Sequence, residues 1–281
     1  MTELRYHMEA QELAAAEAAG PDHVPVVPRP AAAVILARDR DSGPEVLLVR
    51  RRSDVGFAAG AYVFPGGTLD AADGDAAWDE WLDPPPPEAM AGADDPHGPT
   101  ARTFVVAALR ELFEETGVLI ASDPIPDPDR LAADRDALVV GKKLFREIIA
   151  DSGARLAGDR LTLCARWITP ESLSRRYDAR FFLAAAPADV QVRPERGELV
   201  EHVWIAPAVA LERYFRYDFP MLFPTARTLS WLEEGESVED WRRRARDREV
   251  RAILPRLRRV NGDVVPVIPG DPRYDEREGD G

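Results

Sequence analysis

The chain has 281 residues, of which 45% are hydrophobic, and it carries a formal net charge of −14. This length suits one enlarged domain with a substantial core, and the acidic balance argues against a nucleic-acid partner. The single cysteine, Cys164, excludes an intramolecular disulfide and favours a reducing compartment. Its neighbours form a strand-like run, so we expect a buried thiol rather than a nucleophile.

No stretch approaches the roughly 18 consecutive apolar residues that a membrane span requires. The first twenty residues contain four glutamates and lack the apolar core of a signal peptide. We therefore expect a cytoplasmic protein with no membrane partner. The same residues predict a mobile or loosely docked helix, and a proline-punctuated, extended lead-in follows over 21–30.

The first half of the remaining chain alternates apolar runs with turn signals. Its predicted elements are strands at 31–38 and 45–51, a short strand ending at Gly66–Gly67, an insert-like stretch over 75–99 and a helix over 100–117. The helix is the clearest of these, because apolar residues recur near helical spacing. Thr100 can cap its start, and Gly117 suits its end.

The second half continues with further helices and strands. Its predicted elements are a helical pattern over 129–150, strands at 160–170, 179–187 and 198–207, helices at 207–215, 225–234 and 237–246, and a hairpin around Asn261–Gly262 before a polar tail. Together these elements predict an α/β fold with helices on either side of a mixed sheet.

A cluster of carboxylates stands out in the helix over 100–117. Glu111 lies three and four residues before Glu114 and Glu115, so the three side chains project from about one helical face. Their repulsion weakens the helix, and Arg110 offsets only part of it. A hard divalent cation such as Mg²⁺ or Mn²⁺ would resolve the conflict. The alternative is ordinary solvated surface charge, since this pattern is common on exposed helix faces.

The run RELFEETGV, residues 110–118, resembles the second half of the Nudix hydrolase signature, G-x5-E-x7-R-E-U-x-E-E-x-G-U, in which U is aliphatic. Gly67 matches the opening glycine, and Asp73 stands where the family has glutamate. The resemblance covers roughly residues 30 to 235. It implies a Nudix-type α/β/α sandwich with a mixed sheet and a loop–helix–loop catalytic motif, plus extra helices.

The motif is split in this chain. Between its two halves lie 36 residues, 74 to 109, where the family pattern has seven. Such an insert resembles the branch that includes the peroxisomal coenzyme A diphosphatases. The stretch 46–67 is similar to the coenzyme A-associated pattern of that branch, although Gly56 and Phe57 stand near the place of its second arginine and the spacing is one residue short. Three further runs also look like this branch: WITP at 167–170, ARFFLAAAP at 179–187 and FPTARTL at 223–229.

The resemblance implies hydrolysis of a nucleoside diphosphate linked to another group, by water attack on phosphorus with Mg²⁺ or Mn²⁺. Glu111, Glu114 and Glu115 would ligate the metal. Arg110 would orient these carboxylates, and Gly66 would offer its backbone carbonyl to the metal. A metal that bridges a diphosphate neutralises developing charge and acidifies a bound water.

The general base lies either within the signature or on a distant loop, because members of the family differ in this respect. Within the signature Glu111 is the leading candidate. Outside it Glu198 and Glu201, just before a predicted strand, are candidates, against the alternative of solvated loop glutamates. Asp73 would brace the glycine loop or pair with Arg110.

Substrate contacts are predicted beside the glycine loop. Arg50 and Arg52, in the run RRR at 50–52, are candidates for a phosphate contact. Gly67 would give the loop the conformational freedom that it needs. The alternative for the arginines is that residues at a strand end simply point to solvent. The four histidines are scattered, which suggests no histidine metal site.

The leading hypothesis is a metal-dependent pyrophosphohydrolase that cleaves coenzyme A or acyl-CoA to 3′,5′-ADP and (acyl-)4′-phosphopantetheine. One alternative is hydrolysis of ADP-ribose, NADH or dinucleoside polyphosphates. Another is a non-catalytic module that senses a nucleotide, against which the complete carboxylate set speaks. The expected partner is a small-molecule nucleotide diphosphate, and the resemblance allows a homodimer.

The predicted organisation has three parts, namely a lead-in over 1–28, a hydrolase domain over 29–235 and a C-terminal helix, hairpin and polar tail over 236–281. The insert over 74–99 is a candidate lid or specificity element, or else a passive surface addition. If it is a lid, replacing 75–98 by a short linker should spare metal binding but change substrate choice.

Overall fold

The computed structural model describes residues 24–54, 58–122, 127–188, 190–195, 197–260 and 263–275. The expected N-terminal helix, Gly56 and Phe57, the turn at Asn261–Gly262 and the tail from residue 276 lie outside these ranges. Within them an eight-stranded sheet has the order β10-β2-β1-β9-β8-β11, with β3 paired to β2 and β4 to β1. Its strands are β1 (Arg29–Arg38), β2 (Glu45–Arg51), β3 (Tyr62–Val63), β4 (Gly66–Thr68), β8 (Thr162–Ile168), β9 (Tyr177–Ala185), β10 (Leu199–Ile205) and β11 (Ala252–Ile253).

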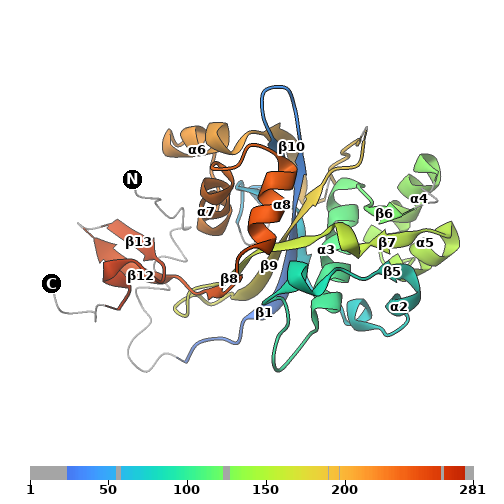
Figure 1. Cartoon of the computed structure of the whole chain (residues 1–281), viewed down its shortest axis with the longest axis horizontal. Helices are drawn as coiled ribbons and strands as arrows, with labels where there is room; N and C mark the ends of the chain where they lie inside the picture. The colour runs from blue at the N-terminus through green and yellow to red at the C-terminus, as the bar shows by residue number, and fades with distance from the viewer. Residues whose placement is uncertain are drawn as a thin grey trace.

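The sheet is mixed, because β1 runs parallel to β9 and β11 parallel to β8, whereas the other pairs are antiparallel. Helices cover both faces (Figure 1). They are α3 (Ala101–Thr116), α4 (Pro128–Val139) and α5 (Phe145–Ser152) on one side and α6 (Pro207–Phe215), α7 (Phe223–Leu232) and α8 (Val238–Arg246) on the other. The predicted α/β/α sandwich is therefore confirmed. Among the described residues, no helix has the length and apolarity to cross a membrane.

Alternation along β1 divides its side chains between two cores. Val34 and Leu36 pack with the apolar face of α3, whereas Ile35 and Ala37 pack with α6, α7 and α8. All four side chains are fully buried. This pattern explains why β1 reads as a continuous apolar run: a strand covered on both faces needs no polar side.

Two segments differ from the predictions. The helical pattern over 129–150 forms two helices, α4 and α5, separated by a turn in which Gly141 has a φ of 70°. The terminal hairpin, β12 (Arg256–Val260) and β13 (Asp263–Val267), is confirmed, but Ala252–Ile253 joins the main sheet beside β8 instead. Pro255 separates these two strands, since proline has no N–H to continue a ladder.

The insert over 74–99 packs into the core on the α3 side. It contains α2 (Trp78–Trp81), β5 (Leu82–Asp83) and a 3₁₀ turn at Pro87–Met90, and β5 pairs with β7 (Arg155–Ala157), which also pairs with β6 (Ala121–Ser122). Trp78 and Ala93 are at most 1% exposed. The guanidinium of Arg180, which is itself fully buried, donates to the carbonyl of Ala93 at 3.1 Å. The insert is therefore not a passive surface addition.

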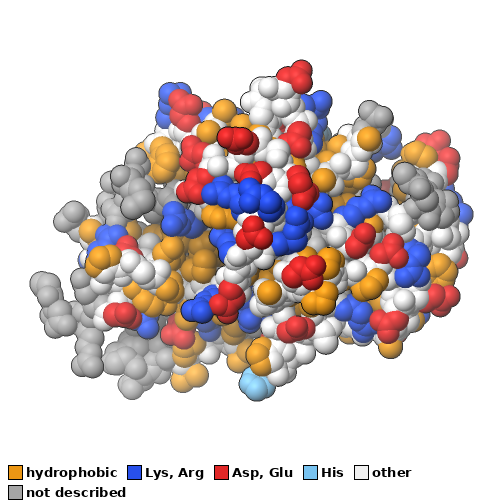
Figure 2. Space-filling model, viewed as in Figure 1, with side chains coloured by type: hydrophobic (Ala, Val, Ile, Leu, Met, Phe, Trp, Pro, Cys, Tyr) orange, Lys and Arg blue, Asp and Glu red, His pale blue; other side chains and the backbone are white. Residues whose placement is uncertain are grey.

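The basic run on α8 is neutralised by its surroundings. Figure 2 shows blue and red side chains interspersed in the middle of the face where α8 lies. Ion pairs join these arginines to nearby carboxylates, namely Arg242 and Arg246 to Glu239, Arg243 to Asp240 and Arg244 to Glu234. This pairing is typical of a solvated helix face.

Candidate active site

Helix α3 carries the carboxylates and is held by its apolar face. Eleven of its sixteen residues are buried, and it packs on β1 and β4. Thr100 occupies the N-cap position, but its hydroxyl contacts that of Thr103 rather than a backbone N–H. Gly117 ends the helix in a left-handed conformation with a φ of 74°, and its N–H donates to Phe113. The residues at positions 111 and 115 are thereby fixed beside β4.

The two glycines of β4 let the backbone approach α3 and β1 closely. Gly66 donates its N–H to the Glu115 carboxylate at 2.9 Å. A Cβ at Gly66 would lie 2.4 Å from the Ala32 carbonyl oxygen, and a Cβ at Gly67 would lie 2.6 Å from the Glu111 carboxylate. Neither glycine has a positive φ. Contrary to the prediction for Gly67, the glycine is needed here for close packing and not for an unusual backbone conformation.

The close approach of Gly67 to Glu111 predicts the effect of adding one methyl group at position 67. Gly67→Ala should displace the Glu111 carboxylate, and because the colliding atoms end a flexible side chain, the fold should survive. We expect kcat to fall about a hundredfold, the typical cost of misplacing a reacting group by about 1 Å. Gly74→Ala is the control, since its Cβ would meet Thr103 at an ordinary 3.8 Å. Equal activity of the two variants in steady-state assays would contradict a functional role for the position of the Glu111 carboxylate.

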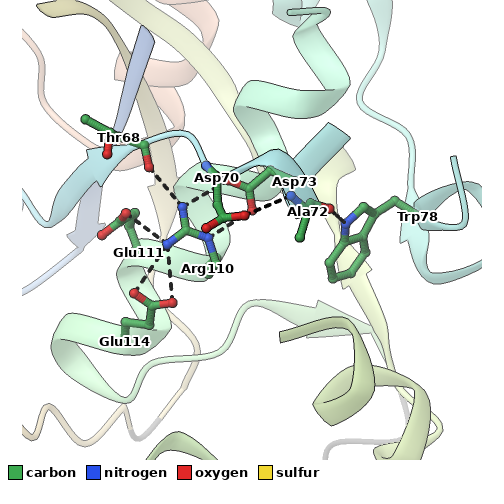
Figure 3. A network of polar contacts seen from close by, with 8 residues as sticks. All are labelled: Thr68, Asp70, Ala72, Asp73, Trp78, Arg110, Glu111 and Glu114. Carbon is green, nitrogen blue, oxygen red and sulfur yellow. Dashed lines mark hydrogen bonds and ion pairs between the residues drawn. The ribbon is translucent and has the colours of Figure 1, made fainter. Parts of the chain in front are cut away.

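Arg110 organises the acidic side chains around it (Figure 3). It makes two hydrogen bonds of 2.9 Å to Asp73, one of 2.9 Å to Glu111 and two of 3.2 and 3.3 Å to Glu114. Asp73 is 1% exposed and also accepts the N–H of Asp70. Asp73 therefore both pairs with Arg110 and braces the glycine loop, which are the two alternatives that the sequence left open.

Burial and mutual repulsion raise the pKa values of the helix carboxyls. The pKa of Glu115 is raised to about 8, first by burial and then by the charge of Glu111. Burial also raises the pKa of Glu111 to about 7, in spite of its bond to Arg110. The pKa of Glu114 is raised by burial as well. Arg110 and, at Glu115, Arg51 offset only part of this rise.

A pocket of about 410 Å³ opens beside these carboxylates. Gly66, Gly67, Glu111 and Glu115 line one part of it. Glu114 does not line it and stays on Arg110. No residue of the insert lines this pocket, so the structure does not support a lid over it.

One arginine of the run at 50–52 reaches the pocket, and it is the middle one. Arg51 lines the pocket and pairs with Glu198 at 3.1 Å, and Glu198 lines the pocket as well. Its neighbours Arg50 and Arg52 lie outside the lining, because successive side chains of a strand point to opposite faces. The structure therefore brings Arg51 to the pocket, and not Arg50 or Arg52, for which the phosphate contacts were expected. Strand alternation separates Arg51 from its two neighbours, but β2 is buried on both faces, so the sequence does not show which face meets the pocket.

The other two arginines have partners elsewhere. Arg52 forms an exposed pair with Asp54 at 2.7 Å. Arg50 pairs with Glu201 at 3.3 Å and lies over the ring of Tyr62. Glu201 is also bonded to the Tyr62 hydroxyl and lies outside the pocket lining. Of the two loop glutamates, only Glu198 faces the pocket.

The loop that carries Glu198 is tied to the end of α3. The carbonyls of Glu115 and Thr116 accept the N–H groups of Glu195 and Arg193 at 2.9 and 2.8 Å. Arg135 of α4 donates twice to the Glu114 carbonyl, at 2.8 and 2.7 Å, and once to the Arg193 carbonyl at 2.7 Å. The last carbonyls of α3 are thus satisfied by the loop and by one arginine. No sequence signal marked Arg135, since its partners are backbone atoms.

Arg135 should therefore position the loop against α3. Arg135→Ala removes three hydrogen bonds, and we expect kcat/KM to fall about tenfold with a loss of about 1.5–3 kcal/mol in the free energy of unfolding. Arg130→Ala is the control, because Arg130 lies on the same helix and bonds the Asp151 carbonyl. Steady-state kinetics and urea unfolding measure both effects. Unchanged kinetics of Arg135→Ala would contradict the positioning role.

The donor set suits a hard cation although no preformed shell is present. Within the described ranges, no three acidic, histidine or cysteine side chains meet in a metal-binding group. Glu111 and Glu115 nevertheless present carboxylate oxygens to one pocket, at a place that lacks positive charge. Oxygen donors around a site short of positive charge fit Mg²⁺ or Mn²⁺ better than soft metals. Glu114 could join them only by leaving Arg110.

Known proteins share both sequence and fold with this chain. No protein-family model matches it. It is 28% identical to human acyl-coenzyme A diphosphatase NUDT19, across 83% of this chain and 72% of the relative, and 28% identical to the Gallus gallus protein of that name, across 83% and 73%. A crystal structure of a NUDIX hydrolase from Alicyclobacillus acidocaldarius superposes with a TM-score of 0.65 at 26% identity, covering 80% of this chain and 98% of that one. The chain thus has a Nudix-type fold and carries a split Nudix signature, and it is similar to Nudix hydrolases over most of its length.

Proposed function

We propose that the protein is a metal-dependent pyrophosphohydrolase whose leading substrate is coenzyme A or acyl-CoA, cleaved to 3′,5′-ADP and (acyl-)4′-phosphopantetheine. The observation that carries the proposal is the convergence of Glu111, Glu115 and Arg51 on one pocket beside the glycines of β4. The relatives named acyl-coenzyme A diphosphatase support the substrate.

Each residue of the pocket has a separate role in this proposal. Glu111 and Glu115 would hold Mg²⁺ or Mn²⁺ with the Gly66 backbone, and the bound cation supplies neutralisation of phosphate charge and acidification of water. Arg110 keeps Glu111 in place through its pair with Asp73. Arg51 contacts a phosphate oxygen of the substrate, because its guanidinium lines the pocket and its Nε has no hydrogen-bond partner among the described residues.

Glu198 is the general base in this proposal. It lines the pocket from a loop outside α3, and its pair with Arg51 sets it beside the proposed phosphate position. Glu111 and Glu115, in contrast, would hold the cation. A base must lie within hydrogen-bond reach of the attacking water, and Glu198 is the acidic residue of the pocket that is free of the ligand role.

Glu198→Gln is therefore expected to lower kcat by about a hundredfold or more while KM changes little. Glu201→Gln serves as the matched control, because Glu201 lies three residues further on, within β10, and bonds Tyr62 and Arg50 outside the pocket. If Glu198→Gln keeps the activity of this control, the base lies within α3 and Glu111 takes that role.

Phosphate release tests the reaction class. A panel of coenzyme A, acyl-CoA, ADP-ribose, NADH and a dinucleoside polyphosphate is incubated with Mg²⁺ and with Mn²⁺. The products are treated with phosphatase, and the phosphate released is measured against a blank without the protein, because phosphatase also removes the 3′-phosphate of intact coenzyme A. We expect turnover of coenzyme A or acyl-CoA that stops on chelation. Absence of turnover on every compound would overturn the enzymatic proposal, and cleavage of ADP-ribose with coenzyme A untouched would overturn the substrate alone.

A further inference from the structure

Beyond the carboxylates, the pocket continues over a floor of small side chains. Strand pairing places Thr68 of β4, Ala31 of β1, Ala179 of β9 and Trp167 of β8 in one row across the sheet. Paired residues share a face of the sheet, and all four line the pocket. With neighbouring strands about 4.8 Å apart, three steps span about 14 Å. Two alanines in the middle of this row leave an elongated trough.

The wall of the trough is aromatic and offers carbon rather than polar atoms. Trp167 and Phe223, both 4% exposed, meet edge to face with ring centroids 5.8 Å apart. The indole N–H of Trp167 is already donated to Thr228 at 3.2 Å. Phe181, two residues after Ala179 on the same face of β9, lies edge to face with Phe64. On the face shown in Figure 2, hydrophobic side chains gather between the β12–β13 hairpin and α8.

A polar row borders the trough where β1 begins. Arg29 is paired with Tyr177, and the hydroxyl of Thr169 accepts the N–H of Tyr177 at 3.0 Å. All three residues line the pocket. The trough thus presents an aliphatic floor with polar groups along one border, and Glu111 and Glu115 line the same pocket.

The side chains of the trough favour binding of one half of a nucleotide conjugate over the other. A nucleoside requires polar partners for its ribose hydroxyls and base edges, and the floor of Ala31, Ala179 and Phe181 provides none. A flexible chain of alternating aliphatic and amide groups fits both floor and border. The three runs WITP, ARFFLAAAP and FPTARTL, which lie far apart in the sequence, all contribute to this trough.

We propose that the trough formed by Ala31, Ala179, Phe181, Trp167 and Phe223 binds the pantetheine arm of coenzyme A. The diphosphate then lies at Glu111 and Glu115, and the adenosine half lies outside the trough. This inference rests on the proposed function, since it names the part of that substrate which the trough selects.

Each product of cleavage contains one half of coenzyme A, so the binding of each product tests where that half binds. Ala179→Phe fills the floor of the trough, and Ala185→Phe, an exposed position at the end of the same strand, is the control. We measure the dissociation constants of 4′-phosphopantetheine and of 3′,5′-ADP by calorimetry with Mg²⁺ present, together with inhibition of the wild-type reaction. Ala179→Phe should weaken 4′-phosphopantetheine at least about tenfold and leave 3′,5′-ADP within about twofold. Ala185→Phe should change neither.

An equal weakening of the binding of both products would overturn the assignment. A selective weakening of 3′,5′-ADP binding would overturn it and place the nucleoside in the trough. If Ala179→Phe does not fold, Ala179→Leu and Leu222→Ala carry the same comparison, because Leu222 lines the pocket at the start of α7. The calorimetry needs no turnover. A wild-type protein that binds 4′-phosphopantetheine through Ala179 but cleaves no coenzyme A would therefore contradict the proposed function and not the trough.

Discussion

Replacing Glu115 by glutamine should lower kcat by about two to three orders of magnitude without unfolding the protein. The substitution keeps the size of the side chain and an oxygen to accept the Gly66 N–H, but it removes the charge that faces the pocket. Because burial and Glu111 already disfavour that charge, its loss should not lower the free energy of unfolding. Steady-state rates with saturating Mg²⁺, calorimetric titration of the cation and thermal unfolding measure the three effects.

Glu114→Gln is the matched control for this experiment. Glu114 lies one residue earlier on α3 and contacts Arg110 outside the pocket lining. It should therefore lose much less activity than Glu115→Gln. Near-full activity of Glu115→Gln would contradict the assignment of Glu115 as a metal ligand. A loss as large in Glu114→Gln would show that Glu114 leaves Arg110 and joins the cation in the active protein.

Deleting residues 75–98 should unfold the protein rather than change its substrate choice. The insert buries Trp78, Leu82, Met90 and Ala93 in the core beside α3. Removing one large buried aromatic side chain costs about 3–5 kcal/mol, and a domain has about 5–15 kcal/mol in total. The deletion would also take the Ala93 carbonyl from the buried guanidinium of Arg180. Soluble yield, circular dichroism and the melting temperature measure the outcome.

Two tryptophans three residues apart provide a finer test of the same idea. Trp78 is 1% exposed and donates to the Ala72 carbonyl beside the glycine loop, whereas Trp81 is only partly buried. Trp78→Ala should therefore cost more stability than Trp81→Ala. A deletion variant that folds with a wild-type melting temperature and an altered substrate preference would instead support the lid that the sequence suggested.

The regular elements could be predicted because their periodicity follows from burial. β1 and β2 read as apolar runs since helices cover both faces of the sheet, and α3 shows its spacing because one face meets β1. The resemblance to the signature also gave the pairing of Asp73 with Arg110 as one of two alternatives, and the structure shows it. The first case depends on local periodicity, and the second on the resemblance of two separated runs to one signature.

Other parts of the site depend on tertiary contacts that no local pattern displays. Arg51 differs from Arg50 and Arg52 only in the face of β2 from which it projects. Arg135 donates to backbone carbonyls, which every residue has, so no partner residue in the sequence indicates its role. The insert looked polar and proline-rich, yet a few apolar residues among its charges anchor it in the core.

The most direct test of the central claim compares coenzyme A with ADP-ribose as substrates of the full chain. Initial rates with Mg²⁺ give kcat/KM for each compound, and mass spectrometry identifies the products. The predicted result is 3′,5′-ADP and 4′-phosphopantetheine from coenzyme A, with kcat/KM at least about tenfold above that of ADP-ribose. A higher kcat/KM for ADP-ribose, or cleavage of coenzyme A at any bond other than its diphosphate, would contradict the account.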